Sequence, residues 1–187
     1  MSTTTSTNAL GLSTGTWQID PAHSTVAFVV RHLMVSKVRG HFERFTGSIT
    51  VAENLVDSSV TADIETASIS TNDETRDKHI RSADFLDVET HPSLTFRSTS
   101  IESSGNDFVV NGELTLHGVT KPVALALEFN GVGNDPWGGT RSGFSAVTEI
   151  NRRDFGVDIS MPLDGGGVVV ADKIKIELEI EAILQAS

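Results

Sequence analysis

The sequence predicts an all-β chain with one short helix, folded as a closed or nearly closed antiparallel barrel of about eight strands. Over most of the chain, apolar and polar residues alternate with a period of two, which is typical of strands with one buried face. Turn-forming residues separate these alternating segments at regular intervals. A single segment breaks the alternation and carries the signals of a helix. These three observations together favour a barrel.

The alternation is clearest in four segments, which we expect to be strands. They are Ser24–Met34, Phe108–His117, Val123–Asn130 and Lys173–Glu181. In the first of them, Val26, Phe28, Val30 and His32 share one face, so His32 should point into the barrel. Weaker alternation predicts further strands at Thr16–Asp20, Arg44–Val51, Val60–Ile69, Leu94–Ile101 and Arg141–Asn151.

Turns are expected where Gly, Ser, Asn and Asp gather, at Glu53–Ser58, Ser103–Asp107, Gly131–Gly139 and Gly165–Gly167. Asn111-Gly112 also has the composition of a hairpin turn. The alternation runs through this pair unbroken, however, so we expect Gly112 to lie inside a strand. A missing side chain there leaves room for a neighbour or a ligand.

The helix is predicted at Asp73–Ser82. Ser70, Thr71, Asn72 and Asp73 are residue types that cap helix N-termini, and acidic residues follow in the first turn. Basic residues gather toward the C-terminal end, on the favourable side of the helix dipole.

The domain organisation is simple. Residues 1–14 are Ser/Thr-rich and are expected to form a disordered tail, and residues 15–187 are expected to form one barrel domain. The N-terminus has neither a positive region nor an apolar run of signal-peptide length, and no segment is apolar enough to span a bilayer. We therefore expect a cytoplasmic protein without stable membrane insertion.

The net charge of -11 argues against nucleic acid as a partner, because phosphate binding depends on Lys and Arg. The same charge disfavours docking on anionic lipid headgroups. The chain has no Cys, which excludes disulfides, thiolate nucleophiles and thiolate metal sites. A lipid handled by this chain would be held inside it, by apolar contact.

An eight-stranded barrel is either filled by its own side chains or hollow around a ligand. With 6% aromatic residues, no Tyr and two Trp, the chain has few large groups to fill a lumen, and Gly112 and Ala146 leave gaps. A packed core without a cavity remains the alternative. If a cavity exists, each buried methylene contributes about 0.8 kcal/mol, so roughly twenty carbons offset association costs of roughly 4–15 kcal/mol.

Seven motifs occur in order between about Gly15 and Leu184. They are His23–Leu33, Val38–Phe42 (a turn motif), Asp77–Asp87, His91–Phe96, Gly112–Val123, Arg153–Gly156 and Val168–Glu179. This ordered set resembles the YceI-like family. The resemblance implies an extended lipocalin-like barrel with a helix beside it, and an apolar tunnel for polyisoprenoids or fatty-acid-like lipids. It also implies a homodimer. Many family members carry a secretion signal, from which this sequence departs.

Strand phase and the resemblance together define a candidate ligand-binding set inside the barrel. Its members are Val26, Phe28, Val30, His32, Phe96, Leu114, Leu116, Leu125, Leu127, Phe144, Ile174 and Ile176. His32 is the expected polar contact to a lipid head group or at the tunnel mouth. The alternative for His32 is a buried ring paired with a neighbouring carboxylate or carbonyl.

No metal and no cofactor other than a bound isoprenoid or fatty-acid-like lipid is expected. His23, His32 and His41 recur every nine residues, and an odd spacing places successive side chains on opposite strand faces. The chain also lacks a GxSxG elbow and a P-loop, and Gly131-Val132-Gly133 does not continue as a dinucleotide fingerprint. We therefore expect a protein that is not an enzyme.

Polar clusters elsewhere are interpreted as structural. Arg152, Arg153 and Asp154 either anchor a polar head or form an ion pair that sets the next turn, and we favour the ion pair. A second group is expected to cap the helix and tie it to the rim, and His117 is expected to face solvent. That group consists of Asp77, His79, Arg81 and Asp84.

Three functional hypotheses follow. The leading one is a carrier or storage protein for a long apolar lipid, namely a polyisoprenoid, an isoprenoid quinone or a fatty-acid-like chain. The second is a ligand-free interaction or stress-response barrel with a packed core. The third is a small enzyme acting on a lipid or an isoprenoid precursor, in which replacing His32 abolishes turnover.

Overall fold

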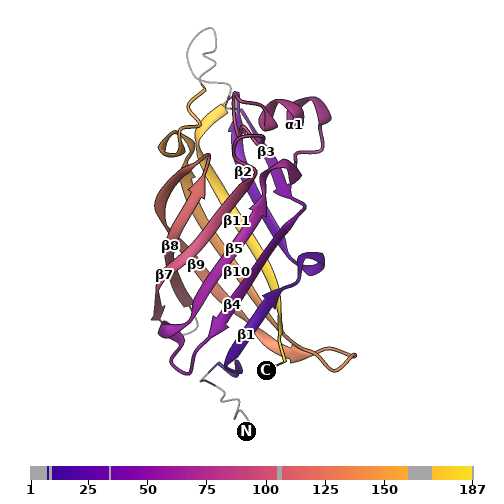
Figure 1. Cartoon of the computed structure of the whole chain (residues 1–187), viewed down its shortest axis with the longest axis vertical. Coiled ribbons are helices and arrows are strands. Elements are labelled where there is room, and N and C mark those ends of the chain that lie inside the picture. Colours follow the sequence, from indigo (N-terminus) through magenta and orange to yellow (C-terminus); the bar gives the residue numbers. More distant parts are fainter. Residues whose placement is uncertain (1–7, 9, 34, 105–106, 160–169, 187) are drawn as a thin grey trace.

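The computed structural model describes residues 8, 10–33, 35–104, 107–159 and 170–186. Figure 1 shows a tall barrel of tilted strands, with the helix α1 at one end and the start of β1 and the end of β11 at the other. The strands are β1 (Gly15–Ile19), β2 (Thr25–His32), β3 (Ser36–Phe42), β4 (Phe45–Val51), β5 (Ser59–Glu65), β6 (Ile69–Ser70), β7 (Ser93–Ser104), β8 (Asp107–Leu116), β9 (Val119–Asn134), β10 (Thr140–Asn151) and β11 (Val170–Leu184). The helices are α1 (Glu74–Arg81) and the short 3₁₀ turns η1 (Pro21–His23), η2 (Leu55–Asp57), η3 (Thr66–Ser68) and η4 (Arg152–Phe155).

Eight strands close into a ring in the order β1-β4-β5-β7-β8-β9-β10-β11, with β11 pairing back onto β1. Every neighbouring pair is antiparallel, so the expected antiparallel barrel of about eight strands is confirmed. The long strand β11 pairs with β1 near its C-terminal end, where Ala182 lies opposite Ile19, and with β2 over its remaining length. β1 and β2 therefore follow one another along β11, with η1 between them.

One strand escaped the sequence analysis. Val38–Phe42 was expected to be a turn, but it lies in β3, which pairs with β2 from Ser36 to Phe42. Gly40 hides the alternation, because it occupies the inward position between Val38 and Phe42 without a side chain. The Phe28 ring from β2 packs over this gap, and a Cβ on Gly40 would overlap the ring.

The strand expected at Val60–Ile69 is broken into β5, η3 and β6. Ser68 Oγ donates to the Glu65 carbonyl oxygen at 2.7 Å and accepts from the Arg44 amide at 3.0 Å. Thr66 donates its hydroxyl to the His91 carbonyl oxygen at 2.8 Å. Such side-chain-to-backbone bonds compete with the strand ladder, and here they bend the chain at the rim.

Strand β9 is longer than expected. It runs to Asn134, so the loop predicted at Gly131–Gly139 shrinks to the turn Asp135–Gly139. The Asp135 carboxylate closes this turn by accepting from the amides of Trp137 at 2.9 Å and Gly139 at 2.8 Å. The Gly139 amide has the largest effect on the pKa of Asp135 and lowers it. The Arg141 guanidinium and the Trp137 amide lower it further.

Two local predictions are confirmed. Asp73 caps α1 by accepting from the Arg76 amide at 3.0 Å, as its place before the acidic first turn predicted. Asn111 and Gly112 lie inside β8 rather than in a hairpin turn. The turn predicted at Gly165–Gly167 lies outside the described residues.

The end of the barrel opposite α1 is filled by an apolar cluster, which we call the base cluster. Its buried members are Leu12, Trp17, Val51, Phe144 and Ala182. Trp17 is completely buried and donates its indole N–H to the Ser13 carbonyl oxygen at 3.0 Å.

Part of the segment expected to be a disordered tail belongs to this cluster. Leu12 is 3% exposed, and Asn8 accepts from the amides of Leu10 and Leu12. Leu10 and Leu12 of this segment add apolar area to the base. Residues 1–7 and 9 lie outside the described part of the chain.

Candidate functional site: an apolar cavity

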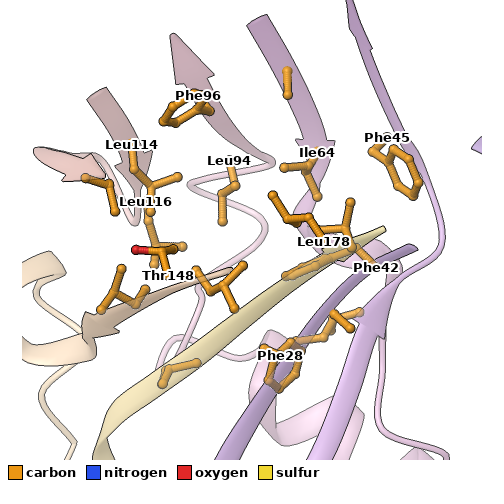
Figure 2. A pocket seen from close by; sticks show the side chains of 18 of the residues that line it. Phe28, Phe42, Phe45, Ile64, Leu94, Phe96, Leu114, Leu116, Thr148 and Leu178 are labelled. Carbon is orange, nitrogen blue, oxygen red and sulfur yellow. The ribbon is translucent and has the colours of Figure 1, made fainter. Parts of the chain in front are cut away.

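A cavity of about 430 Å³ occupies the interior of the barrel above the base cluster. Its wall is almost entirely apolar and includes residues from the ring strands, from β2 and β3, and from α1. Sites for small molecules in proteins measure roughly 300–1,000 Å³, so this volume lies within the usual range. Figure 2 shows Phe28, Ile64, Leu94 and Leu178 arranged around the open space.

The exposure of the inward side chains shows that the interior is hollow. In β9, Val123, Leu125 and Leu127 line the cavity and are only half-buried, although they face inward. In a core packed by its own side chains, such residues would be fully buried. The alternative of a solid core is therefore wrong for this chain.

Two glycines help keep the lumen open. A Cβ on Gly112 would overlap the Phe96 ring and come within 2.6 Å of the Arg97 carbonyl oxygen. Gly40 receives the Phe28 ring in the same way. Both rings lie against the wall where a side chain is missing, so the room expected beside Gly112 is used by a neighbouring residue.

The structure brings the candidate set together in the cavity wall. All members line the cavity: Val26, Phe28, Val30, His32, Phe96, Leu114, Leu116, Leu125, Leu127, Phe144, Ile174 and Ile176. Their position is a fact of the fold, and their contact with a ligand stays a prediction.

Sequence reasoning missed another part of the wall. These residues include Val38, Phe42, Phe45, Ile64, Ile80, Phe85, Leu86, Leu94, Leu178 and Ile180. Leu178 and Ile180 continue the stripe of Ile174 and Ile176, so strand phase alone had the signal for them. Ile80, Phe85 and Leu86 belong to α1 and the loop after it, and nothing in a strand pattern indicates that a helix faces the lumen.

The arginine and histidine side chains of the cavity lie at the end covered by α1. They are Arg31, His32, Arg76, His79 and Arg152, and the wall also includes Thr46, Thr71 and Thr148. His32 ends β2 and is half-buried, and its ring has no hydrogen-bond partner among the described residues. The alternative in which a neighbouring carboxylate or carbonyl pairs with this ring finds no support in that part of the chain.

Arg152 has a structural role. It is 2% exposed and donates to the carbonyl oxygens of Val157 at 2.7 Å, Ala171 at 3.1 Å and Val170 at 3.2 Å. Burial lowers the pKa of this guanidinium, and Asp172, 3.2 Å away, partly offsets that effect. Because its donors are used on the backbone, Arg152 joins Val157 to the start of β11 instead of anchoring a ligand.

Polar residues of α1 bond to the segments on either side of the helix, and the expected tie to the barrel rim stays a prediction. The buried Asp77 carboxylate accepts from the Thr71 amide at 2.9 Å and the Thr71 hydroxyl at 2.6 Å. Arg76 donates to the same threonine, to its hydroxyl at 2.7 Å and its carbonyl oxygen at 2.8 Å. His79 and Asp84 form an exposed pair at 3.0 Å.

His117 does not face solvent as expected. Its ring is half-buried, with Nδ1 3.1 Å from the Phe155 carbonyl oxygen and its centroid 4.8 Å from that of His91. The left-handed backbone of His117, with φ of 55°, turns the side chain toward η4 instead of outward.

Among the described residues, no helix combines the length and the apolar character that crossing a bilayer takes.

Known proteins resemble this chain over nearly its whole length. A UPF0312 protein of Vibrio cholerae is 40% identical over 164 residues, which is 87% of this chain and 82% of that protein. The crystal structure of Burkholderia cenocepacia BcnA has a TM-score of 0.76 at 24% identity, covering 87% of this chain and 98% of BcnA. A polyisoprenoid binding domain from Saccharophagus degradans, implicated in plant cell wall breakdown, has a TM-score of 0.70 at 16% identity, covering 90% and 98%.

The family comparison agrees with these likenesses. The YceI-like domain matches residues 17–182, which run from the base-cluster tryptophan in β1 almost to the end of β11. The match includes every strand of the closed ring. The chain therefore belongs to the YceI-like family.

Proposed function

We propose that this protein binds one long apolar lipid in its barrel and acts as a carrier or storage protein for it. The ligand class is a polyisoprenoid, an isoprenoid quinone or a fatty-acid-like chain. The observation that carries the proposal is the apolar cavity of about 430 Å³ above a filled base. The similar fold of a polyisoprenoid binding domain supports the same ligand class.

The energetics favour hydrocarbon. Each buried methylene contributes about 0.8 kcal/mol, so a chain of roughly twenty carbons gains about 16 kcal/mol, against association costs of roughly 4–15 kcal/mol. The wall offers few polar contacts, and a hydrocarbon tail needs none. Because the arginine and histidine side chains lie at the α1 end, the lipid's polar head belongs there, near His32, with the tail toward the base cluster.

A binding role fits the cavity better than a catalytic one. In the described part of the chain, no carboxylate lines the cavity, and the ring of His32 has no acidic partner to orient it as a general base. His79 does pair with Asp84, on the exposed side of the helix. A small enzyme acting on a lipid stays the competing function. It predicts turnover that His32→Ala abolishes without unfolding the protein, whereas a carrier shows none to abolish.

Plugging the cavity tests the proposal. Leu127→Trp and Leu116→Trp place an indole in the lumen, and Ala124→Trp places the same group on the exposed outer face of β9. We expect uptake of a long-chain isoprenoid quinone to weaken at least tenfold in both lumen variants and to stay unchanged in the outer one. Equal uptake by all three would contradict the proposed site.

We also propose that the protein forms the homodimer that its family resemblance implies. Light scattering coupled to size exclusion measures the mass directly. We expect twice the 20.0 kDa mass of one chain.

A further inference from the structure

Two loops at the α1 end of the barrel bring together three side chains of the kind that bind metal ions. Asp87 and His91 lie between α1 and β7, and His117 lies in the turn between β8 and β9 (Figure 1). The carboxylate oxygen and the two imidazole nitrogens all lie within 4.8 Å of one another. All three residues are half-buried.

The hydrogen bonding of His117 prepares it as a ligand. Its Nδ1 lies 3.1 Å from the Phe155 carbonyl oxygen, and a carbonyl only accepts, so Nδ1 carries the hydrogen. The neutral ring then leaves a lone pair on Nε2. Metal-binding histidines commonly donate their other ring N–H to a backbone carbonyl in this way, which holds the tautomer and the ring direction.

The other two groups are without partners. The Asp87 carboxylate and the His91 ring form no hydrogen bond or ion pair with any described residue, so both are free to take a metal ion. The comparable group of Asp20, His23 and Glu181 differs, because Arg141 donates to both of its carboxylates, at 2.8 and 2.9 Å. A cation already occupies the centre of that second group.

The backbone around the cluster is shaped to bring these side chains together. Asp87 and His117 have left-handed φ angles of 48° and 55°, which are uncommon for residues other than glycine and cost free energy. Next to His117, Gly118 leaves room for the His91 ring, since a Cβ there would come within 2.8 Å of the ring's Cε1. Strained residues of this kind gather at ligand sites.

We infer that Asp87, His91 and His117 form a binding site for a divalent transition-metal ion, with Zn²⁺ as the best fit. Two imidazole nitrogens and one carboxylate oxygen match the donors that zinc takes, and they leave a fourth position for water or another ligand. Tetrahedral zinc ligands are roughly 3.4 Å apart at the usual bond lengths, so small side-chain rotations close the site. The bound ion would join the loop after α1 to the β8–β9 turn beside the cavity residues Leu86 and Leu116. This inference does not depend on the proposed lipid.

Metal titration of the full-length protein, stripped with a chelator, tests the site. We expect one Zn²⁺ per chain at pH 7.5. Asp87→Asn and His117→Asn keep residue types that tolerate a left-handed backbone, and each should weaken binding at least tenfold. His91→Asn should do the same.

The matched control is His23→Asn, which removes an imidazole from the group around Arg141 and should leave zinc binding unchanged. The intact protein provides a second measurement that needs no variant: added Co²⁺ should give the visible absorption of a tetrahedral nitrogen and oxygen site. Absence of zinc binding by the intact protein, or equal weakening by His23→Asn, would overturn the inference.

Discussion

At the scale of single residues, the most consequential side chain is a buried arginine. Arg152 donates hydrogen bonds to the backbone carbonyl oxygens of Val157, Val170 and Ala171. It lies at the end of the barrel where the cavity has its arginine and histidine side chains. The sequence indicated a structural ion pair at this position. It could not indicate the carbonyl partners, because two of the three, Val170 and Ala171, come from the start of β11, eighteen and nineteen residues away.

Replacing Arg152 should therefore destabilise the fold strongly. Arg152→Met keeps the length of the side chain but leaves buried carbonyl oxygens without donors, and we expect it to lower the free energy of unfolding by about 3 kcal/mol. Arg153→Ala removes only an exposed ion pair with Asp172 and should cost less than about 1 kcal/mol. Urea denaturation at pH 7 measures both, and similar costs for the two variants would contradict the role given to Arg152.

A second residue-scale prediction concerns acid. Hydrogen bonds from Arg141 and then His23 lower the pKa of Asp20 to about 2, from an ordinary 3.8. Because the pKa is lower in the folded protein, the ionised carboxylate stabilises the fold above about pH 4, and this contribution disappears as the pH falls toward 2. We expect about 1 kcal/mol once solvent screening is taken into account.

Thermal denaturation between pH 5 and pH 2 measures this contribution. Asp20→Asn should lower stability at pH 5, and the difference from the natural chain should vanish near pH 2. A difference that stays constant over the whole range would contradict the assigned cause.

At the scale of strands and helices, local chemistry decided what the sequence could show. The cap at Asp73 predicted α1, and unbroken alternation predicted that Asn111 and Gly112 lie within β8. β3 was missed because Gly40 stands where the alternation calls for an inward apolar residue. A glycine is needed there because the Phe28 ring of the neighbouring strand fills the space of a side chain. The break after Glu65 depends on hydrogen bonds from distant loops, which a local pattern does not contain.

Gly112 gives the prediction for this scale. Gly112→Ala places a methyl group against the Phe96 ring and the Arg97 carbonyl, and we expect a loss of about 2–3 kcal/mol from overpacking. Gly133→Ala, in β9, meets no atom within 4 Å and should change the free energy of unfolding by less than about 1 kcal/mol. The midpoints of urea denaturation of the two variants are compared with that of the unchanged protein. If Gly112→Ala costs no more than Gly133→Ala, the Phe96 ring does not need the gap at Gly112.

At the scale of the whole molecule, the fold was more predictable than the site. Period-two alternation gave both the barrel and the inward stripes, because a strand with one apolar face has to bury it. Whether the apolar stripes meet or leave a space depends on the diameter of the barrel and on the positions of aromatic side chains such as Phe28. The sequence of a single strand does not determine either of them. The wall from α1, with Ile80 and Phe85, and the cluster of Asp87 with two histidines arise only when distant loops meet.

The central claim is that the hollow in the barrel holds a lipid. Native mass spectrometry of the purified full chain, with organic extraction of the same sample, measures this most directly. The account predicts a long apolar molecule at close to one per chain, released by the solvent and rebound when a long-chain isoprenoid quinone is added. A chain that carries no lipid after purification and takes up none when it is offered would contradict it.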